Sequence, residues 1–265
     1  MSPPTFRTFL TEVASVEDVH PHLRKVTFRG GDLETFEPVG PDTFLYLLLP
    51  PPGRDALTID QSFTWEAHGT MAEEDKPVGA YYTVRAWRPE VAELDILMVM
   101  HGDPGPASGW AMRAGTGDPV ALWGPRTAYA PPDGTAELLV VVDETGLPAA
   151  AVIVEELPDD VRAVVVAEVA CEAERLELAD RPNVTVRWLH RDGAPAGTTT
   201  LLADTVRSLP PLAPNTYVWG GAESKAMTAV RRHVRGERGL PREATSLVAY
   251  WRHVDTSDED DAESR

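Results

Sequence analysis

The sequence predicts two domains, an all-β domain followed by an α/β domain built on a parallel sheet. Up to about residue 130, short apolar segments alternate with Gly and Pro and show no sustained helical period, which favours an antiparallel barrel or sandwich. From about residue 135, strand and helix patterns alternate, which indicates a parallel sheet flanked by helices. The length of 265 residues suits two domains of ordinary size.

Each expected element follows from its local pattern. Apolar runs bounded by turn residues predict a single helix at 110–114 and strands at 23–28, 43–49, 79–87, 93–99 and 119–123. Beyond the turn-rich connector 130–134, the patterns predict strands at 138–142, 163–169, 184–189 and 217–219 and helices at 147–157, 201–208 and 223–237. We therefore expect domains at residues 1–133 and 134–254, followed by an acidic tail at 255–265.

Composition restricts the class of protein. A formal net charge of −18 argues against binding to nucleic acid, because the surface repels polyanions, and the dense acidic tail is expected to be disordered. No apolar run approaches the roughly 20 residues that cross a bilayer, and the first residues lack a secretory signal. We expect a cytoplasmic monomer without integral membrane association.

The single cysteine, Cys171, excludes an intramolecular disulfide and a Cys-rich metal site, and we expect a buried thiol at a strand end.

A first candidate binding segment is the extended run Tyr82-Thr83-Val84-Arg85. Strand alternation places Tyr82 and Val84 on one face and Thr83 and Arg85 on the other. An aromatic ring and a hydroxyl suit an isoalloxazine ring, and an arginine suits a pyrophosphate, so the run predicts a flavin contact. An amphipathic barrel strand with an exposed arginine is the alternative.

A second candidate segment follows about twenty residues later, where a Gly- and Pro-rich turn leads into the expected helix. Backbone N–H groups at a helix start bind phosphate, small residues allow its close approach, and Ser108 adds a hydroxyl. The segment predicts a pyrophosphate site with contributions from His101, Gly105, Pro106, Ala107, Ser108, Trp110 and Ala111. An ordinary turn with Ser108 as a helix cap is the alternative.

A third candidate segment is the turn Asp143-Glu144-Thr145-Gly146 between a strand and a helix. Nucleotides bind beyond the carboxyl ends of strands in open parallel sheets, which makes Asp143, Glu144 and Thr145 candidate cofactor contacts. The turn lacks the GxGxxG pattern, so a plain strand–helix turn is the competing interpretation.

Taken in order, these segments resemble the siderophore-interacting proteins, also called siderophore ferric reductases, of the ferredoxin-reductase-like superfamily. Members carry Arg-x-Tyr-Thr-x-Arg, HG…GPAS-x-WA, Gly-Pro-Arg, DETALPA, Trp-x-x-Gly-Glu followed by arginines, and Tyr-Trp-Arg. The resemblance covers nearly the whole chain. The matching positions are Tyr82 to Arg85, His101 to Ala111, Gly124-Pro125-Arg126, Asp143 to Ala149, Trp219 to Glu223 with Arg231-Arg232, and Tyr250-Trp251-Arg252.

The chain departs from the family pattern at three places. Ala80 stands where the flavin motif begins with arginine, so a phosphate-side cation is missing and we expect weaker flavin binding. Gly146 replaces an alanine, which we expect to free the turn. After Arg252 the chain continues with His253-Val254 and the acidic tail, and not with a glycine-containing end.

The resemblance implies an antiparallel flavin-binding barrel joined to an α/β nucleotide-binding domain, with FAD between them. It also implies reduction of a ferric siderophore, which releases iron because oxygen chelators hold Fe(II) weakly. FAD carries this chemistry, so we expect no catalytic side chain, and none of the seven histidines has a metal-ligand spacing. The candidate substrate residues are Arg126 and Arg252, although each could equally be a surface ion-pair partner.

The acceptor and the electron donor remain open at this point. Alternatives are a flavin reductase or diaphorase that serves another acceptor, and a binding protein that carries a ferric chelate without turnover. NADPH or NADH is the expected donor and reduced ferredoxin is a further candidate, because neither Asp143-Glu144 nor Glu168 is decisive for recognition of a ribose or a 2′-phosphate.

Overall fold

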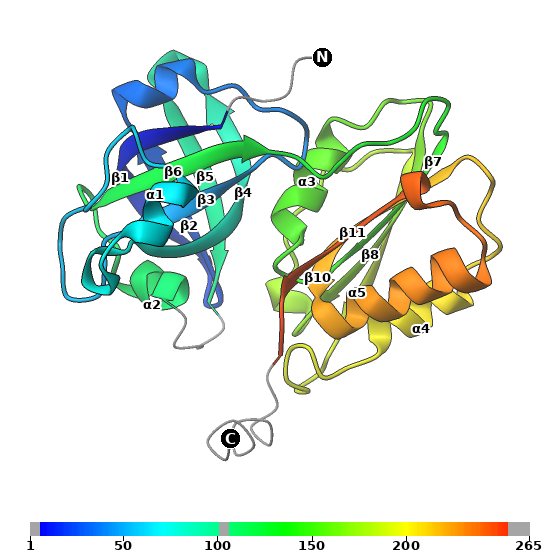
Figure 1. The fold of residues 1–265 in the computed structure, drawn as a ribbon. Helices are drawn as coiled ribbons and strands as arrows, with labels where there is room; N and C mark the ends of the chain where they lie inside the picture. Colours follow the sequence, from blue (N-terminus) through cyan, green and yellow to red (C-terminus); the bar gives the residue numbers. More distant parts are fainter. Residues whose placement is uncertain (1–5, 101–105, 254–265) are drawn as a thin grey trace. The chain divides into compact units, whose positions relative to one another are not determined.

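The computed structural model describes residues 6–100 and 106–253. The chain divides into two compact units, with the division between Tyr129 and Ala130 (Figure 1). The predicted acidic tail, 255–265, lies outside the described residues. No helix in the described ranges combines the length and the apolar character needed to cross a membrane.

The first unit is a closed antiparallel barrel, which confirms the predicted class and decides between barrel and sandwich. Its strands follow the order β1-β2-β5-β4-β3-β6, and pairing of β1 with β6 closes the barrel. The prediction missed the long strand β1, whose apolar residues are interspersed with charges. The elements are β1 Arg7–His20, β2 Leu23–Arg29, β3 Phe44–Leu49, α1 Trp65–Thr70, β4 Val78–Arg88, β5 Glu93–Val99, α2 Pro106–Arg113 and β6 Pro119–Arg126.

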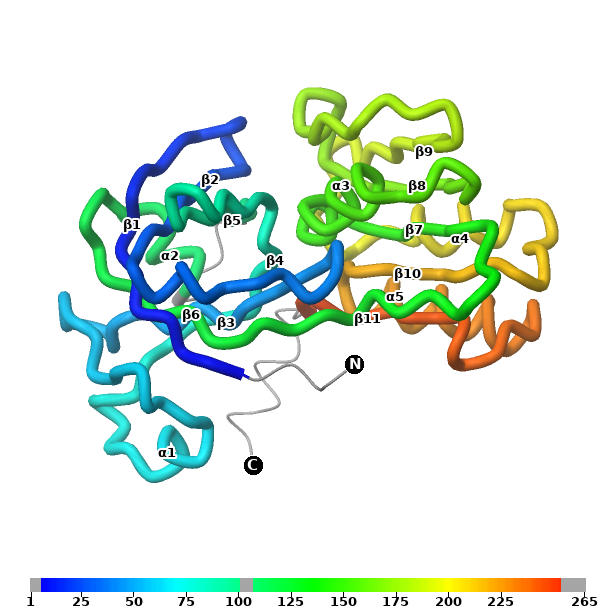
Figure 2. The backbone as a smooth tube through the Cα atoms, turned by 90° about the horizontal axis from the view of Figure 1, so that it is seen from above, coloured from blue at the N-terminus to red at the C-terminus, as the bar shows by residue number. Residues whose placement is uncertain are grey.

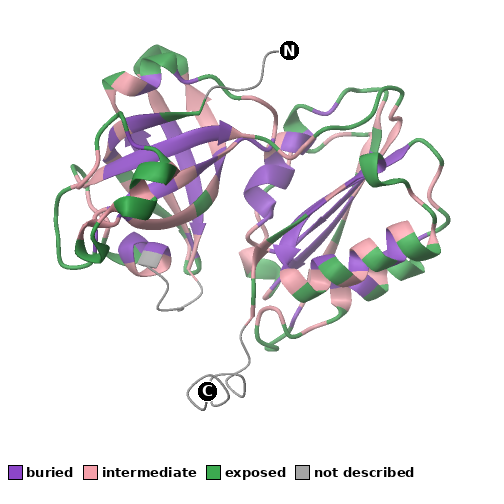
Figure 3. Ribbon diagram, viewed as in Figure 1, coloured by how far each residue is buried: buried purple, intermediate pink, exposed green. Residues whose placement is uncertain are grey.

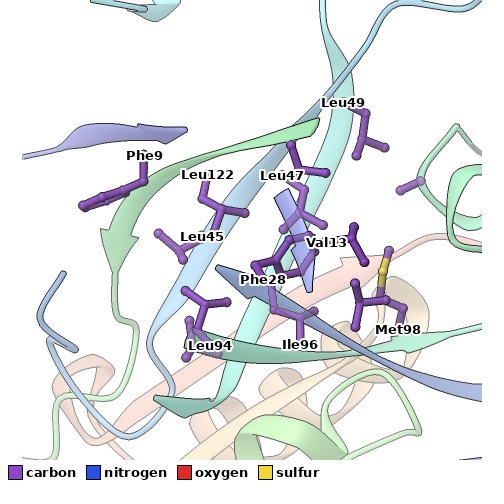
Figure 4. Close-up of a cluster of buried hydrophobic side chains, with 14 of the residues drawn as sticks. Phe9, Val13, Phe28, Leu45, Leu47, Leu49, Leu94, Ile96, Met98 and Leu122 are labelled. Atoms are coloured by element: carbon purple, nitrogen blue, oxygen red, sulfur yellow. The ribbon is translucent and has the colours of Figure 1, made fainter. Parts of the chain in front are cut away.

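Alternation along the strands fills the inside of the barrel with large apolar side chains. Leu45 and Leu47 of β3 point inward together with Leu122 of β6, and all three are fully buried (Figure 4). Helix α2 lies at one end of the barrel and adds Trp110, whose indole stacks with Phe28 at 6.4 Å between ring centroids. This packing holds α2 next to β4 and β5.

The outer face of β3, β4 and β6 carries a second set of apolar residues. Leu48 and Trp123 point outward, and Phe63 and Trp65 from the segment between β3 and β4 cover them. Alternation therefore buries both faces of this part of the barrel wall, one in the core and one beneath the segment that contains α1.

The second unit is a five-stranded parallel sheet in the order β11-β10-β7-β8-β9, as predicted for an α/β domain (Figure 2). Helices α4 and α5 lie side by side on one face of the sheet and α3 lies on the other. The central strands are buried, whereas α4 and α5 expose one side to solvent (Figure 3). The elements are β7 Glu137–Val142, α3 Leu147–Glu155, β8 Arg162–Val169, β9 Val184–His190, α4 Leu201–Ser208, β10 Thr216–Glu223, α5 Ser224–Arg231 with a π-helical continuation Arg232–Glu237, and β11 Thr245–Trp251.

Cys171 differs from its prediction, because its thiol is exposed and not buried. The last buried residue of β8 is Val169, and Cys171 lies two residues further, in the bend that precedes a 3-10 turn. The predicted strand, 163–169, ends where β8 ends, so the error was to extend burial to a residue beyond the strand.

Gly146 lies in the turn between β7 and α3 and corrects a second expectation. A Cβ at this position would lie 2.1 Å from the carbonyl oxygen of Gly221 in β10 and 2.8 Å from Val142 Cγ1. Gly146 therefore does not loosen the turn: the missing side chain allows two backbone segments to pack directly against each other.

We expect Gly146→Ala to destabilise the second unit by about 1–3 kcal/mol, because one of the two backbones must move. Thermal unfolding should show a Tm lower by several degrees. Gly236→Ala is the matched control, since a Cβ there meets nothing within 4 Å, and its Tm should stay level or rise slightly. Equal Tm values for the two variants would contradict the close approach at Gly146.

Candidate functional site

The start of α2 contains a buried hydroxyl. Ser108 lies in the first turn of α2, and its Oγ is buried and forms no hydrogen bond with any residue that the structure describes. A buried polar atom normally has a partner, and one at a helix start, next to free backbone N–H groups, suits a phosphate oxygen. The donor set here fits the pyrophosphate of a flavin nucleotide.

The neighbouring strand β4 presents the predicted flavin motif. Tyr82 and Val84 share the inward face and pack against the barrel core, as alternation predicts, while Thr83 lies on the other face and is also buried. Burial raises the pKa of Tyr82 to about 12, so its phenol stays protonated and can donate a hydrogen bond. Arg85 is half-buried at a register shift between β4 and β5.

Ala80 lies on the same inward face of β4, opposite Leu47, and packs against the core. No cation stands at the start of the motif, which leaves Arg85 as its arginine. Of the other residues predicted for this site, Ala107, Trp110 and Ala111 are buried in the core and Pro106 begins α2. The contributions predicted for His101 and Gly105 fall on residues outside the described ranges.

Arg126 ends β6 on the outer face of the barrel, among aromatic rings. Its guanidinium carbon lies 4.7 Å from the ring centroid of Phe6, 4.8 Å from that of Trp123 and 5.7 Å from that of Tyr81. The Nε atom is buried without a hydrogen bond. Among the described residues Arg126 forms no ion pair.

In the second unit, the carboxylate of Asp143 joins three strand ends. Its Oδ1 accepts from the backbone N–H of Thr145 at 2.9 Å and from the Thr145 hydroxyl. Its Oδ2 accepts from the backbone N–H of Glu223 at 2.9 Å and from Trp251 Nε1 at 2.8 Å. The ends of β7, β10 and β11 therefore meet on one buried carboxylate.

Glu144 is also engaged within the unit. It forms a bidentate pair with Arg191, with N–O distances of 2.7 and 2.8 Å, and Arg191 lies 3.6 Å from Glu168. The hydroxyl of Thr199 donates to Glu168 at 2.9 Å, and burial raises the pKa of Glu168. Sequence reasoning missed Arg191, although its place directly after β9 puts it at the same edge of the sheet.

The carboxylates of Asp143 and Glu223 bind backbone N–H groups at two helix starts on the same edge. The turn before α3 bonds internally to Asp143, and the side chain of Glu223 accepts from the backbone N–H groups of Lys225 and Ala226 at the start of α5. An anion at either turn would have to displace a carboxylate.

A cavity of about 480 Å³ lies beside the start of α5, lined by Thr198, Thr199, Thr200, Lys225 and His253 among others. Arg252, the other predicted substrate residue, is exposed just beyond β11.

The buried Asp143 makes stability depend on pH. Burial, followed by the charge of Glu144, raises its pKa from 3.8 to about 6. The folded state therefore holds the proton more tightly than the unfolded chain, so this contribution is complete below 3.8 and is lost as the pH rises through 6.

We expect the unfolding free energy of the wild type, minus that of Asp143→Asn, to fall by about 1.3 kcal/mol between pH 5 and pH 7. Urea unfolding followed by tryptophan fluorescence at a series of pH values measures this difference. Subtracting the unfolding free energy of the variant removes the contribution of the other titrating groups, which both proteins share. A difference independent of pH would show that Asp143 is ionised throughout this range.

Two family models cover most of the chain. Residues 12–129 match the siderophore-interacting FAD-binding domain, and residues 135–254 match the siderophore-interacting protein model. Both matches fall on the two units described above. The barrel is thereby an FAD-binding domain of this family, consistent with the open hydroxyl of Ser108.

Three similar proteins agree with these matches. The ferric vibriobactin reductase ViuB of Vibrio cholerae is 28% identical over 238 residues, covering 88% of this chain and 85% of that protein. The siderophore-interacting protein SipS from Aeromonas hydrophila has a TM-score of 0.76 at 30% identity, covering 94% of this chain and 100% of that one. A siderophore utilization protein from T. fusca has a TM-score of 0.79 at 31% identity, covering 95% of both chains. From these matches along both units, the chain belongs to the siderophore-interacting protein family.

Proposed function

We propose that this protein is an FAD-dependent reductase of ferric siderophores that releases iron as Fe(II). The Ser108 hydroxyl at the start of α2 supports the proposal, because it is buried without a partner among the described residues and would suit a phosphate oxygen of the cofactor. The family models that match the chain are FAD-binding and siderophore-interacting. The similarity to a ferric vibriobactin reductase supports the reaction. As part of the same proposal, the protein acts as a monomer in the cytoplasm.

The side chains of the barrel hold and orient the cofactor in this proposal. Ser108 and the first N–H groups of α2 bind the pyrophosphate, together with Arg85. Tyr82 and Thr83 of β4 contact the ring system, where the protonated phenol of Tyr82 can donate a hydrogen bond. FAD, when bound, accepts two electrons from a donor and delivers them singly to ferric iron.

The substrate is a ferric chelate, and we propose that Arg126 and Arg252 attract its negative charge. Arg126 supports this role most directly, since its guanidinium has no carboxylate partner in the described ranges. In a chain with a net charge of −18, a cation left unpaired provides a local attraction for an anionic ligand.

We further propose NADPH or NADH as the electron donor, with reduced ferredoxin as the alternative. Asp143, Glu144 and Thr145 were predicted as cofactor contacts, but the bonds of Asp143 and Glu223 leave little room for a pyrophosphate at the starts of α3 and α5. A nicotinamide nucleotide would instead use the cavity beside Lys225 and Thr198–Thr200.

An anaerobic spectroscopic experiment tests the reaction. The protein is loaded with FAD, reduced chemically and mixed with a ferric siderophore in the presence of a ferrous trap. Reoxidation of the flavin together with trapped Fe(II) is the expected result. Flavin that stays reduced would indicate a different acceptor, and failure to bind FAD would support a carrier without turnover.

Ser108→Ala provides a sharper test of the cofactor site. We expect FAD affinity to fall by about two- to tenfold, the cost of one hydrogen bond. The apo protein should keep or gain stability, because the variant removes a buried hydroxyl that has no partner. Titration of the apo protein with FAD, followed by flavin fluorescence, and urea unfolding measure the two effects.

Ser208→Ala is the matched control, since that hydroxyl bonds to Thr205 O on α4 in the other unit. Its FAD affinity should equal that of the wild type. Unchanged affinity in Ser108→Ala as well would remove Ser108 from the cofactor site.

A further inference from the structure

Arginines gather where α5 ends and its π-helical continuation begins. The segment 231–242 contains five arginines and one acidic residue, Glu237. In a chain with a formal net charge of −18, this segment reverses the charge locally. We call three of these residues, Arg231, Arg235 and Arg242, the arginine cluster.

Two members of the cluster are fixed on β11. Arg231 Nη2 donates to the carbonyl oxygen of Leu247 at 2.6 Å. Arg235 donates to the carbonyl oxygen of Thr245 at 3.1 Å and, through Nε, to the Thr245 hydroxyl at 2.6 Å. Among the described strands β11 pairs only with β10, so it forms one edge of the sheet (Figure 2). The guanidinium groups therefore lie beside the first residues of an edge strand.

The residues that the structure describes do not neutralise the cluster. The printed partners of Arg231 and Arg235 are uncharged oxygens, and no member forms an ion pair with a described carboxylate. Glu237 pairs instead with His233 Nδ1 at 2.7 Å. Burial, and then the charges of Arg231 and Arg242, lower the pKa of Arg235. The cations are thus close enough to repel one another, and an anion with several carboxylates would relieve that repulsion.

The acidic tail, 255–265, is a polyanion of the required charge. Its acidic residues are Asp255, Asp258, Glu259, Asp260, Asp261 and Glu263. The sequence alone predicts disorder for this tail, because its carboxylates repel one another. A cationic surface would offset the same repulsion, so the charges of the tail and of the cluster are complementary.

The tail is attached within reach of the cluster. His253, whose backbone N–H donates to Glu223 Oε1 at 3.2 Å, lies just beyond the end of β11. The seven residues of β11 span about 23 Å at about 3.3 Å per residue. An extended chain that turns back after His253 covers the same distance by Asp260, seven residues further along. The acidic run 258–261 can therefore lie level with the start of β11.

We propose that the acidic tail folds back along the outer edge of β11 and docks on the arginine cluster of the same chain. Its carboxylates at 258–261 pair with the three guanidinium groups. Attachment to the same chain gives the tail an effective concentration of about millimolar at the cluster, so a contact that is weak between separate molecules is occupied within one. This inference is independent of the proposed function.

A distance measurement on the full-length chain tests the proposal. Spin labels are attached in Cys171→Ser/Gly236→Cys/Ala262→Cys, since position 236 is next to Arg235 and a Cβ there meets nothing within 4 Å. Pulsed electron paramagnetic resonance should give a narrow distribution near about 15 Å at low salt, the value for adjacent segments. A tail that is not docked would give a broad distribution near about 30 Å, because nine flexible residues spread about 17 Å from His253.

Charge variants in the labelled chain identify the contact. Arg231→Gln/Arg235→Gln/Arg242→Gln should shift the distribution to about 30 Å, as should salt at about 1 M, where the Debye length is about 3 Å. Glutamine keeps an N–H donor for the carbonyl oxygens of β11, and the urea midpoint establishes that the variant is folded. Arg187→Gln is the matched control, since Arg187 is exposed on β9 at the opposite edge of the sheet, and its distribution should equal that of the labelled parent.

Three results would overturn the inference. The first is a broad distribution near about 30 Å in the labelled parent at low salt. The second is a short distance that persists in the triple arginine variant. The third is a short distance that disappears when the labelled chain is diluted with an excess of unlabelled protein, because the tail would then dock on a second copy. A short distance that survives this dilution and is lost with the three arginines supports docking within one chain.

Discussion

The buried carboxylate of Asp143 is the interaction on which the edge of the second unit depends. It accepts hydrogen bonds from Thr145, from the backbone of Glu223 and from the indole of Trp251, so three parallel strands end at one group. Removing such a carboxylate would leave several buried donors unsatisfied. The close backbone contact of Gly146 with Gly221 lies at the same turn, so packing and hydrogen bonding constrain it together.

The start of α2 differs from the starts of α3 and α5. In the second unit, Asp143 and Glu223 satisfy the turns before α3 and α5 from within the protein. In the first unit, the start of α2 leaves the Ser108 hydroxyl without a partner. Since helix starts attract anions, this contrast favours the barrel as the unit that holds the cofactor phosphates.

The sequence was sufficient to predict the fold class, because both hydrophobic periods are clear. Alternating apolar runs identified β2 to β6, and the strand–helix alternation identified most of the second unit. Strand β1 was missed because charged residues interrupt its apolar pattern. Cys171 was expected to be buried, although it lies two residues beyond the predicted and observed end of β8. Boundaries depend on tertiary contacts that a local pattern does not contain.

The sites were predicted less completely, for a physical reason. Position at a strand end identified Asp143 and Glu144, but only the structure shows that their carboxylates bind Thr145, Trp251 and Arg191. Likewise, the Gly-Pro-Arg motif identified Arg126, while its contact with Phe6 depends on a residue just before β1, about 120 positions earlier in the chain. Contacts between distant segments cannot be read from local spacing.

Local charge decides where an anion can bind on a chain whose net charge is −18. At the edge of the second unit, Arg191 is neutralised by Glu144 and lies beside Glu168, so its charge is already used within the protein. On the outer face of the barrel, Arg126 lies among aromatic rings, which carry no net negative charge to pair with its guanidinium. Two arginines of equal charge therefore lie in different surroundings: Arg191 is paired within the α/β unit, and Arg126 forms no ion pair with any described residue.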